Sequence, residues 1–124
     1  MQINAISFGY SHPLKTQWKQ GKMPELQHDF YDGSLLNKDT VTLEHLLPRS
    51  KGGKTTISNL VLTNYENNMK RSNRDIRNYI NEEAARQYIE EVKKVKTDLI
   101  NGEVYARCLV NRLKSLGVKL YETI

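Results

Sequence analysis

The amino-acid sequence predicts a small α+β domain with two short strands and a helical majority. The strand signals lie near the middle of the chain: the alternating, β-branched run TVTLEHL from Thr40 and the apolar run Leu60–Leu62. A polar segment rich in Asn and Lys follows the second run. Apolar residues recur at helical spacing before and after this centre. We therefore expect a strand–loop–strand–helix core at residues 40–72, with one helix before it and a helical hairpin after it.

The helix before the core is predicted to begin at Ser11-His12-Pro13, which offers a polar cap and a proline at the first helical position. It would end at Gly21. Leu14 and Trp18 are four residues apart, so they would share the face that packs on the core. The simplest role for His12 is capping or surface exposure.

Two further segments before the core give weaker signals. Residues 1–10 hold a short mixed run that could form a strand or an extended arm. Residues 28–40 are turn-prone, with Asp32-Gly33 as the strongest turn signal. His28 lies in this segment without a clustered partner, so we interpret it as an ordinary loop residue.

The helical extension is predicted at residues 74–117. Residues 74–80 could continue the helix of the core or start a new one. Asn81 gives a polar cap, and the periodic apolar residues that follow predict a long helix that ends at Gly102. A second helix is expected from residue 103 to 116, ended by Gly117. The two helices would form a hairpin that packs over the small core.

Composition sets the class of the protein and narrows its partners. We expect residues 1–124 to form one domain, because the chain is short. The net charge of +5 favours a polyanionic partner such as nucleic acid, although simple solubility explains it equally well. Cys108 is the single cysteine, so no internal disulfide or cysteine-based zinc site is expected, and we interpret it as a small buried hydrophobe. No signal peptide or long apolar stretch is recognisable, which predicts a cytoplasmic protein without a membrane partner.

Three side chains of the core suit metal-assisted hydrolysis of a phosphodiester bond. Such a reaction needs a cation on the phosphate oxygens and a base that deprotonates the attacking water. Glu44 supplies a carboxylate and Asn67 or Asn68 an amide oxygen, and hard divalent cations prefer oxygen ligands. His45 is the one side chain of the core whose ordinary pKa lies near neutrality, which makes it the natural general base. We therefore interpret the core as that of a nuclease.

The adjacency of Glu44 and His45 raises a geometric objection. Neighbouring residues on a regular strand point to opposite faces. For the two side chains to serve one site, we expect the strand to end or bulge between them. Pro48 is consistent with a strand that breaks here. Asn59 lies just before the second strand, where its amide could bond the backbone across the loop.

The order of residue types in the core resembles the motif of HNH endonucleases. The residues that carry this resemblance are Glu44-His45, Pro48, Ser50, Gly52-Gly53, Asn59-Leu60-Val61-Leu62 and Asn67-Asn68-Met69-Lys70. The spacing also fits that family, with 14 positions from His45 to Asn59 and nine from Asn59 to Asn68. The resemblance covers about a quarter of the chain and implies the ββα-metal fold, a two-stranded hairpin followed by a helix.

Carried over position by position, the resemblance implies a role for each motif residue. His45 would be the general base, and Glu44 would bind the metal. Asn68 would be the second metal ligand, with Asn67 as the alternative one residue away; the two lie about 100° apart on a helix, so only one should reach the metal. The remaining positions would shape the loop between the strands: Pro48, Gly52, Gly53 and Asn59. The family usually cleaves DNA with Mg²⁺ or Mn²⁺ and leaves 5′-phosphate and 3′-hydroxyl ends.

The chain departs from the family at one informative place. Many HNH proteins carry two C-x-x-C pairs that bind a structural zinc ion. The first pair would fall at Asp29 and Asp32, followed by Gly33, and the second near Asn64 and Asn67. None of these residues is cysteine, so we expect no structural zinc. The attached helices would then supply the missing stability.

A basic cluster directly after the motif is the predicted place for phosphate contacts. Its members are Lys70, Arg71, Arg74 and Arg77. Farther along the chain, basic residues alternate with glutamates, which is typical of an ordinary solvated helix face.

The sequence thus predicts a metal-dependent HNH endonuclease that hydrolyses DNA. Two alternatives use the same scaffold: a non-catalytic module that binds nucleic acid, and a nuclease that acts on RNA. One site per chain suggests nicking of one strand or a homodimer that cuts both, and the sequence does not choose between them. By analogy only, small stand-alone proteins of this type resemble those of phages and mobile elements.

Overall fold

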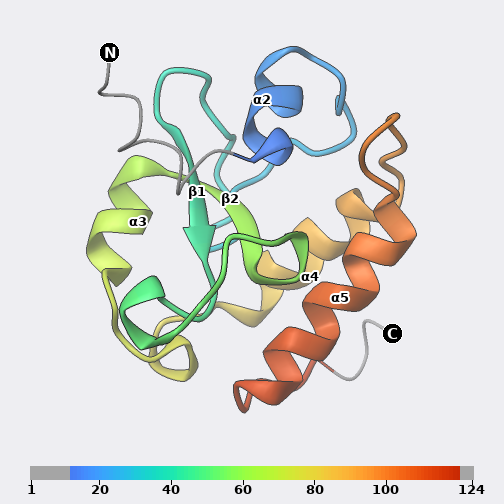
Figure 1. Cartoon of the computed structure of the whole chain (residues 1–124). Helices are drawn as coiled ribbons and strands as arrows, with labels where there is room; N and C mark the ends of the chain where they lie inside the picture. Colours follow the sequence, from blue (N-terminus) through green and yellow to red (C-terminus); the bar gives the residue numbers. More distant parts are fainter. Residues whose placement is uncertain (1–11, 121–124) are drawn as a thin grey trace, which may run out of the picture.

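The computed structural model describes residues 12–120, and these form an α+β fold in which helices surround a two-stranded sheet (Figure 1). The predicted fold class is therefore confirmed, whereas the prediction for residues 1–10 lies outside the described part. The elements in chain order are α2 (Pro13–Lys19), β1 (Val41–His45), the 3-10 helices Arg49–Lys51 and Ile57–Asn59, β2 (Leu60–Asn64), α3 (Tyr65–Arg71), the 3-10 helix Ile76–Asn78, α4 (Glu82–Val92) and α5 (Gly102–Ser115). None of the helices in residues 12–120 has the length and apolar character that a membrane crossing needs.

Helix α2 begins and ends where the sequence indicates. Pro13 occupies the first turn, and Nδ1 of His12 accepts a hydrogen bond from the backbone N–H of Leu14 at 3.0 Å. Gly21, with φ +80°, lies just beyond the end of the helix. Leu14 is fully buried and Trp18 is partly buried against the core. The indole N–H of Trp18 donates to the carbonyl of Leu26 at 2.6 Å, so this helix is fixed by both apolar packing and a polar bond.

Strands β1 and β2 pair antiparallel in regular register, from Val41 opposite Asn64 to His45 opposite Leu60. The predicted strand–loop–strand–helix order is confirmed. Helix α3 follows β2 without a connecting loop and ends at Arg71, because the next residue, Ser72, has a φ of +50° that is incompatible with a continuing helix. Residues 74–80 therefore do not continue α3, and they contain only the short 3-10 turn Ile76–Asn78.

The end of helix α4 and the start of helix α5 differ from the predicted boundary between the two helices of the hairpin. Helix α4 begins after its Asn81 cap as expected, but it ends at Val92 and not at Gly102. Gly102 is the first residue of α5, capped by Asn101, whose side chain accepts from the N–H of Val104. A Cβ at Gly102 would lie 2.0 Å from the carbonyl oxygen of Val92, so this glycine permits the close approach of the two helices. The hairpin itself is present, and its connection is longer than predicted.

Two tyrosines attach this helical hairpin to the outer edge of β2. The N–H of Leu62 donates to the hydroxyl of Tyr88 at 3.0 Å, and the hydroxyl of Tyr105 donates to the carbonyl of Leu60 at 2.6 Å. Burial raises the pKa of both phenols, so they remain protonated at neutral pH. Figure 1 shows the result, with α3 on one side of the two strands and α5 on the other.

A buried carboxylate joins the 28–34 turn to the start of α3. Asp29 is fully buried, and its Oδ1 accepts from the N–H of Tyr31 and the hydroxyl of Thr63, each at 2.7 Å. Its Oδ2 accepts from the N–H of Asn64 at 2.7 Å and from the amide of Asn67 at 3.1 Å. All four donors are neutral groups.

The hydrogen bonds to Asp29 bring together the positions at which zinc-binding HNH proteins would carry cysteine. Asn67 also donates to the carboxylate of Asp32, which lowers the pKa of that group despite the opposing effect of burial. Asp29, Asp32, Asn64 and Asn67 thus form one hydrogen-bonded cluster, which we call the Asp29 cluster. Side-chain and backbone hydrogen bonds hold this corner of the fold.

We predict that Asp29→Asn lowers the free energy of unfolding by about 2–4 kcal/mol, because an amide nitrogen would face donors that now have a carboxylate oxygen. Urea unfolding followed by circular dichroism measures this loss. Asp39→Asn is the matched control, because Asp39 is exposed, and its effect should stay within about 0.5 kcal/mol. A loss at Asp29 no larger than that of the control would show that the cluster contributes little.

Candidate active site

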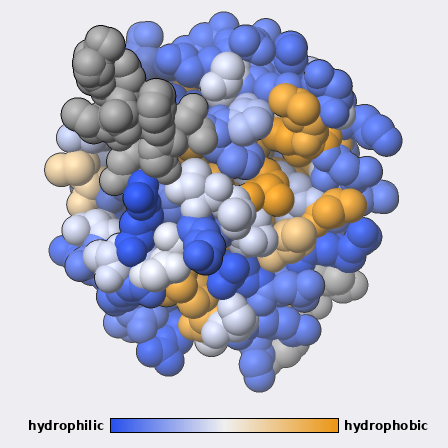
Figure 2. All heavy atoms as spheres, in the orientation of Figure 1, coloured by the Kyte–Doolittle hydropathy of each residue, from blue (hydrophilic) through white to orange (hydrophobic). Residues whose placement is uncertain are grey.

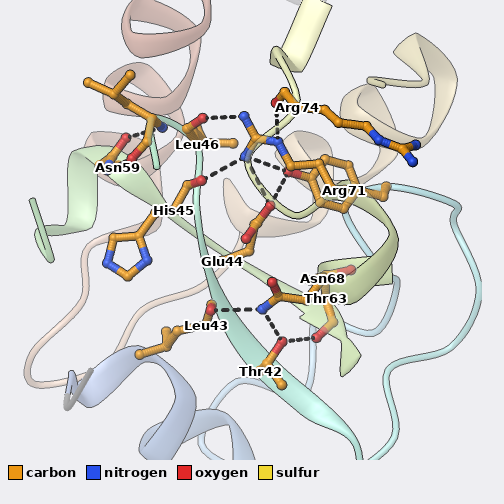
Figure 3. Close-up of polar contacts among 12 residues, drawn as sticks. Thr42, Leu43, Glu44, His45, Leu46, Asn59, Thr63, Asn68, Arg71 and Arg74 are labelled. Carbon is orange, nitrogen blue, oxygen red and sulfur yellow. Dashed lines mark hydrogen bonds and ion pairs between the residues drawn. The ribbon is translucent and has the colours of Figure 1, made fainter. Parts of the chain in front are cut away.

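Glu44 and Asn68 lie on the same side of β1, facing α3 (Figure 3). Glu44 is the fourth residue of β1, and Asn68 lies in the middle of α3. Glu44 is 5% exposed, whereas Asn68 is half-buried. The direct connection from β2 into α3 turns the helix back along β1, which brings these two residues to one face although they are far apart in the chain.

The amide of Asn68 has one chemically consistent orientation. Its nitrogen donates to Oγ1 of Thr42 at 2.9 Å and to the carbonyl of Leu43 at 3.3 Å. The Thr42 hydroxyl already donates to the carbonyl of Thr63, and a carbonyl can only accept, so both partners require a donor. The amide oxygen of Asn68 must therefore point away from them, and within residues 12–120 it accepts no hydrogen bond.

Two side-chain donors hold one oxygen of the Glu44 carboxylate, and the backbone N–H of His45 also donates to this carboxylate. The hydroxyl of Tyr31 donates to Oε2 at 2.5 Å, and Nη1 of Arg71 lies 3.0 Å from it. Burial raises the pKa of the Glu44 carboxyl, and the bonds from Tyr31 and Arg71 oppose that rise. Burial and the charge of Glu44 raise the pKa of Tyr31 well above its usual range, so the phenol keeps the proton that it donates.

Arg71 differs from the other members of the predicted basic cluster because it is buried. Its side chain is 1% exposed and makes a buried ion pair with Glu44. It also donates to the carbonyls of His45, Leu46 and Arg74 at 2.7–2.9 Å. The donors of this guanidinium are therefore directed to protein groups in this structure, and Arg71 does not share the exposure of the other predicted phosphate contacts.

His45 lies on the other side of β1 from Glu44 (Figure 3). The expectation that the strand ends or bulges between the two residues is wrong, because the regular register continues through Glu44 opposite Val61 and His45 opposite Leu60. The strand ends only after His45. The two candidate residues are therefore neighbours at the end of one strand with opposed side chains.

The ring of His45 is fixed by a bond to the loop that joins the strands. Its Nε2 lies 2.9 Å from Oγ1 of Thr55, and the residue as a whole is 8% exposed. Burial lowers the pKa of His45, and the positive charge of Arg49 lowers it further. Both effects favour the neutral imidazole, which is the form that can accept a proton.

An apolar hollow adjoins the His45 side of the hairpin. It has a volume of about 550 Å³ and lies between the start of α2, the loop before β2 and the start of α5, and Thr55 contributes to its wall. Its apolar lining includes Ile57, Leu99, Ile100 and Val104. In Figure 2, apolar side chains gather in the region between α2 and the first part of α5, on a face that is otherwise mostly hydrophilic.

Asn59 spans the loop between the two strands. Its Oδ1 accepts from the N–H of Leu47 at 2.9 Å, and its Nδ2 donates to the carbonyls of Leu47 and Lys54, each at 3.0 Å. These are the cross-loop bonds expected from the sequence. Gly53 packs so closely on Leu47 that a Cβ would lie 1.7 Å from its carbonyl oxygen. The loop is therefore a defined structure.

Two other motif positions shape the same loop. The carbonyl of Pro48 accepts from the N–H of Lys51 at 2.9 Å and from the N–H of Gly53 at 3.0 Å, which closes a tight turn. Gly52 adopts a left-handed conformation with φ +93° at the end of this turn, where a residue with a side chain would be strained.

Part of the chain is similar to a known protein family. Residues 28–75 match a family model described as HNH endonuclease, and no curated protein matches the chain. This part of the chain is therefore similar to the HNH endonuclease family. The match supports nuclease activity in general. HNH endonucleases generally use a divalent metal and act on DNA.

The HNH motif of this chain presents two asparagines with different surroundings. Asn67 is buried, and its amide donates into the Asp29 cluster. Asn68 turns its amide oxygen away from the strand that its nitrogen bonds. Within residues 12–120, no three His, Cys, Asp or Glu side chains gather in a way that could hold a metal. On the α3 side of β1, the candidate oxygen ligands for a metal are the carboxylate of Glu44 and the amide of Asn68.

The exposed basic residues after the HNH motif differ from one another. Lys70 and Arg74 are exposed. Arg77 is also exposed, but it pairs with Asp75 at 2.7 Å, and this bond lowers the pKa of Asp75 to about 2. Lys70 and Arg74 are therefore the members of the predicted cluster whose charges face solvent without an ion pair to any residue in the described range 12–120.

Sequence reasoning did not identify two residues of the HNH site. Tyr31 bonds Glu44 from the turn-prone segment before β1, and Thr55 bonds His45 from the loop. Neither carries a local signal, because a tyrosine among turn residues and a threonine in a polar loop are ordinary. Their contact with the site depends on the fold.

We predict that Asn59→Ala destabilises the protein by about 2–4 kcal/mol and also lowers nuclease activity, because three cross-loop bonds are lost and the loop carries Thr55. Thermal unfolding and plasmid cleavage measure the two effects. Asn111→Ala, at an exposed position of α5, is the control for removing an amide. A loss of rate with an unchanged melting temperature would contradict the structural role of Asn59.

Proposed function

We propose that the protein is a metal-dependent endonuclease that hydrolyses DNA phosphodiester bonds. In this proposal His45 is the general base, and Glu44 and Asn68 are the protein ligands of one divalent cation. The orientation of the Asn68 amide is the observation that carries the proposal, because its nitrogen is used by β1 and its oxygen faces away from the strand.

The donor set fits a hard divalent cation. A carboxylate and an amide oxygen are ligands that Mg²⁺ and Mn²⁺ accept, and so few protein ligands would leave room for water and substrate. Bound there, the cation would supply positive charge to the phosphate oxygens and the leaving oxygen. Asn67 fits less well, since its amide nitrogen is used by a buried carboxylate and its side chain is enclosed.

His45 has the properties of a base that is neutral before the reaction. Its lowered pKa keeps the ring unprotonated near neutrality. A neutral imidazole carries a lone pair on one of its ring nitrogens, and that nitrogen would take the proton from water. Water oxygen then bonds to phosphorus as the bond to the 3′ oxygen breaks, which gives a 5′-phosphate and a 3′-hydroxyl. For His45 and Glu44 to act on one phosphate, the DNA backbone must cross the end of β1.

Charge and similarity to the HNH family support DNA as the substrate. The chain carries a net charge of +5, and the exposed Lys70 and Arg74 follow the motif directly. Contacts from such side chains fix the backbone of a duplex without reading its sequence. We place nonspecific phosphate contacts at these two residues, with Arg77 as a weaker third because of its pair with Asp75.

The first test is cleavage of supercoiled plasmid with Mg²⁺, with Mn²⁺ and with EDTA. We expect nicked or linear product with a divalent metal, none with EDTA, and a loss of about 100-fold or more in His45→Ala, because a general base contributes on that scale. The ratio of nicked to linear product then reports whether one or two strands are cut.

Two outcomes of this test favour other functions. If no metal supports cleavage but the plasmid still shifts on a gel, the chain is a binding module on the HNH scaffold. If a matched RNA substrate is cut and the plasmid is not, the protein is an RNA nuclease. Cleavage that survives in His45→Ala would move the general base to another residue.

A second test separates the two asparagines. We predict that Asn68→Ala weakens Mn²⁺ binding by about tenfold or more, since the loss of one ligand costs on the order of 1.4 kcal/mol or more. Asn67→Ala should lower the melting temperature and leave Mn²⁺ affinity of the folded protein nearly unchanged, because its amide serves the Asp29 cluster. Titration calorimetry with Mn²⁺ measures both. The reverse ranking would move the metal ligand to Asn67.

A further inference from the structure

Arg71 places a buried guanidinium directly beside the candidate metal ligand. Its Nη1 lies 3.0 Å from Oε2 of Glu44, and the hydroxyl of Tyr31 donates to the same oxygen at 2.5 Å. Nη1 of Arg71 also lies 3.3 Å from the Tyr31 hydroxyl, so the three groups contact one another. Figure 3 shows the guanidinium between the carboxylate and the end of β1.

We propose that Arg71 and Tyr31 are positioning residues that fix the carboxylate of Glu44 through its Oε2, leaving Oε1 as the oxygen that meets a divalent cation. The proposal rests on the proposed function, because it takes Glu44 as a metal ligand. It assigns Arg71 to the inside of the site and gives a role to Tyr31, which lies 13 residues before Glu44 in the chain.

The remaining bonds of Arg71 extend this role to the backbone beside the candidate base. Nη1 donates to the carbonyl of His45 at 2.8 Å, and Nη2 donates to the carbonyl of Leu46 at 2.9 Å. Nε donates to the carbonyl of Arg74 at 2.7 Å. One planar fork therefore holds the side chain of Glu44, the end of β1 and the turn after α3 in a single arrangement.

Tyr31 is itself held in place by aromatic neighbours. Its ring packs edge-on against Phe30 at 5.3 Å and against Tyr79 at 5.0 Å between ring centroids. Its backbone N–H donates to Asp29. The hydroxyl thus meets Glu44 from a fixed ring, so the position of this carboxylate is set from two separate elements.

The substitution Arg71→Lys distinguishes a positioning role of Arg71 from phosphate binding. Lysine keeps the positive charge and binds phosphate as a point charge, but it lacks the planar fork that meets five acceptors. We expect Arg71→Lys to cut plasmid about tenfold more slowly or worse under saturating metal, because small displacements at a reacting centre cost that much. DNA affinity in EDTA, and its dependence on salt, should stay within about twofold of wild type.

Two further variants serve as controls for the comparison of Arg71→Lys with wild type. Lys70→Gln removes an exposed charge one residue away and should lower the slope of log affinity against log salt by about 0.9, the value for one phosphate contact. Arg107→Lys, at an exposed position of α5, controls for the chemical change from arginine to lysine. Circular dichroism and thermal unfolding establish that the variants compared are folded at the assay temperature.

Tyr31→Phe tests the same arrangement without changing charge or volume, and it serves if Arg71→Lys does not fold. We expect about threefold to tenfold weaker Mn²⁺ binding, because the freed carboxylate must be ordered when the ion binds. Turnover should fall with an unchanged KM for DNA. Tyr65→Phe, at an exposed tyrosine of α3, is the matched control.

The outcomes separate this proposal from the proposed function. If wild type cuts DNA and binds Mn²⁺ but Tyr31→Phe matches it in both, or binds Mn²⁺ more tightly, the positioning role is wrong. If Arg71→Lys cuts as fast as wild type, or loses DNA affinity more than turnover, Arg71 is not a positioning residue. If wild type neither cuts nucleic acid nor binds Mn²⁺, the proposed function fails and takes the role of Glu44 with it.

Discussion

A two-stranded sheet has two open edges, and the rest of this fold depends on how they are closed. Isolated hairpins are marginal in water, and unpaired backbone groups are costly when buried. On the β2 edge, the hydroxyls of Tyr88 and Tyr105 take the place of a third strand. On the β1 edge, Asn68 and Arg71 of α3 bond the carbonyls of Leu43 and His45. Because both edges are closed by side chains from helices, the helices can be placed only where those side chains reach.

Buried charge is the second constraint, and hydrogen bonds and an ion pair satisfy it in the described residues. The carboxylate of Asp29 is met by four neutral donors, and that of Glu44 by a guanidinium, a phenol and the backbone N–H of His45. A buried charge that loses its partners costs several kcal/mol, so each arrangement fixes its surroundings closely. The Asp29 cluster fixes the start of α3, and Arg71 fixes its end. The helix that carries Asn68 is thus anchored at both termini by polar groups.

The sequence predicted the elements that have local causes and missed those that depend on distant partners. Alternation and apolar runs located both strands, and the proline and polar cap located α2. Gly102 was assigned to the wrong helix because a glycine between two helical patterns can end one or begin the next, and only its packing on Val92 decides. Arg71 was assigned to phosphate because it lies in a basic run. Its real partners, Glu44 and Tyr31, are 27 and 40 residues away in the chain.

The residues of the candidate site also hold the fold together, and this dual use explains how so small a core presents them. The nitrogen of Asn68 closes the edge of β1, which obliges its oxygen to face outward. One oxygen of Glu44 receives Tyr31 and Arg71, which sets the direction of the other. In each case half of the functional group is bound by the protein, and the remaining half is oriented as a consequence. Preorganisation of the site therefore needs no additional structure beyond the bonds that close the sheet.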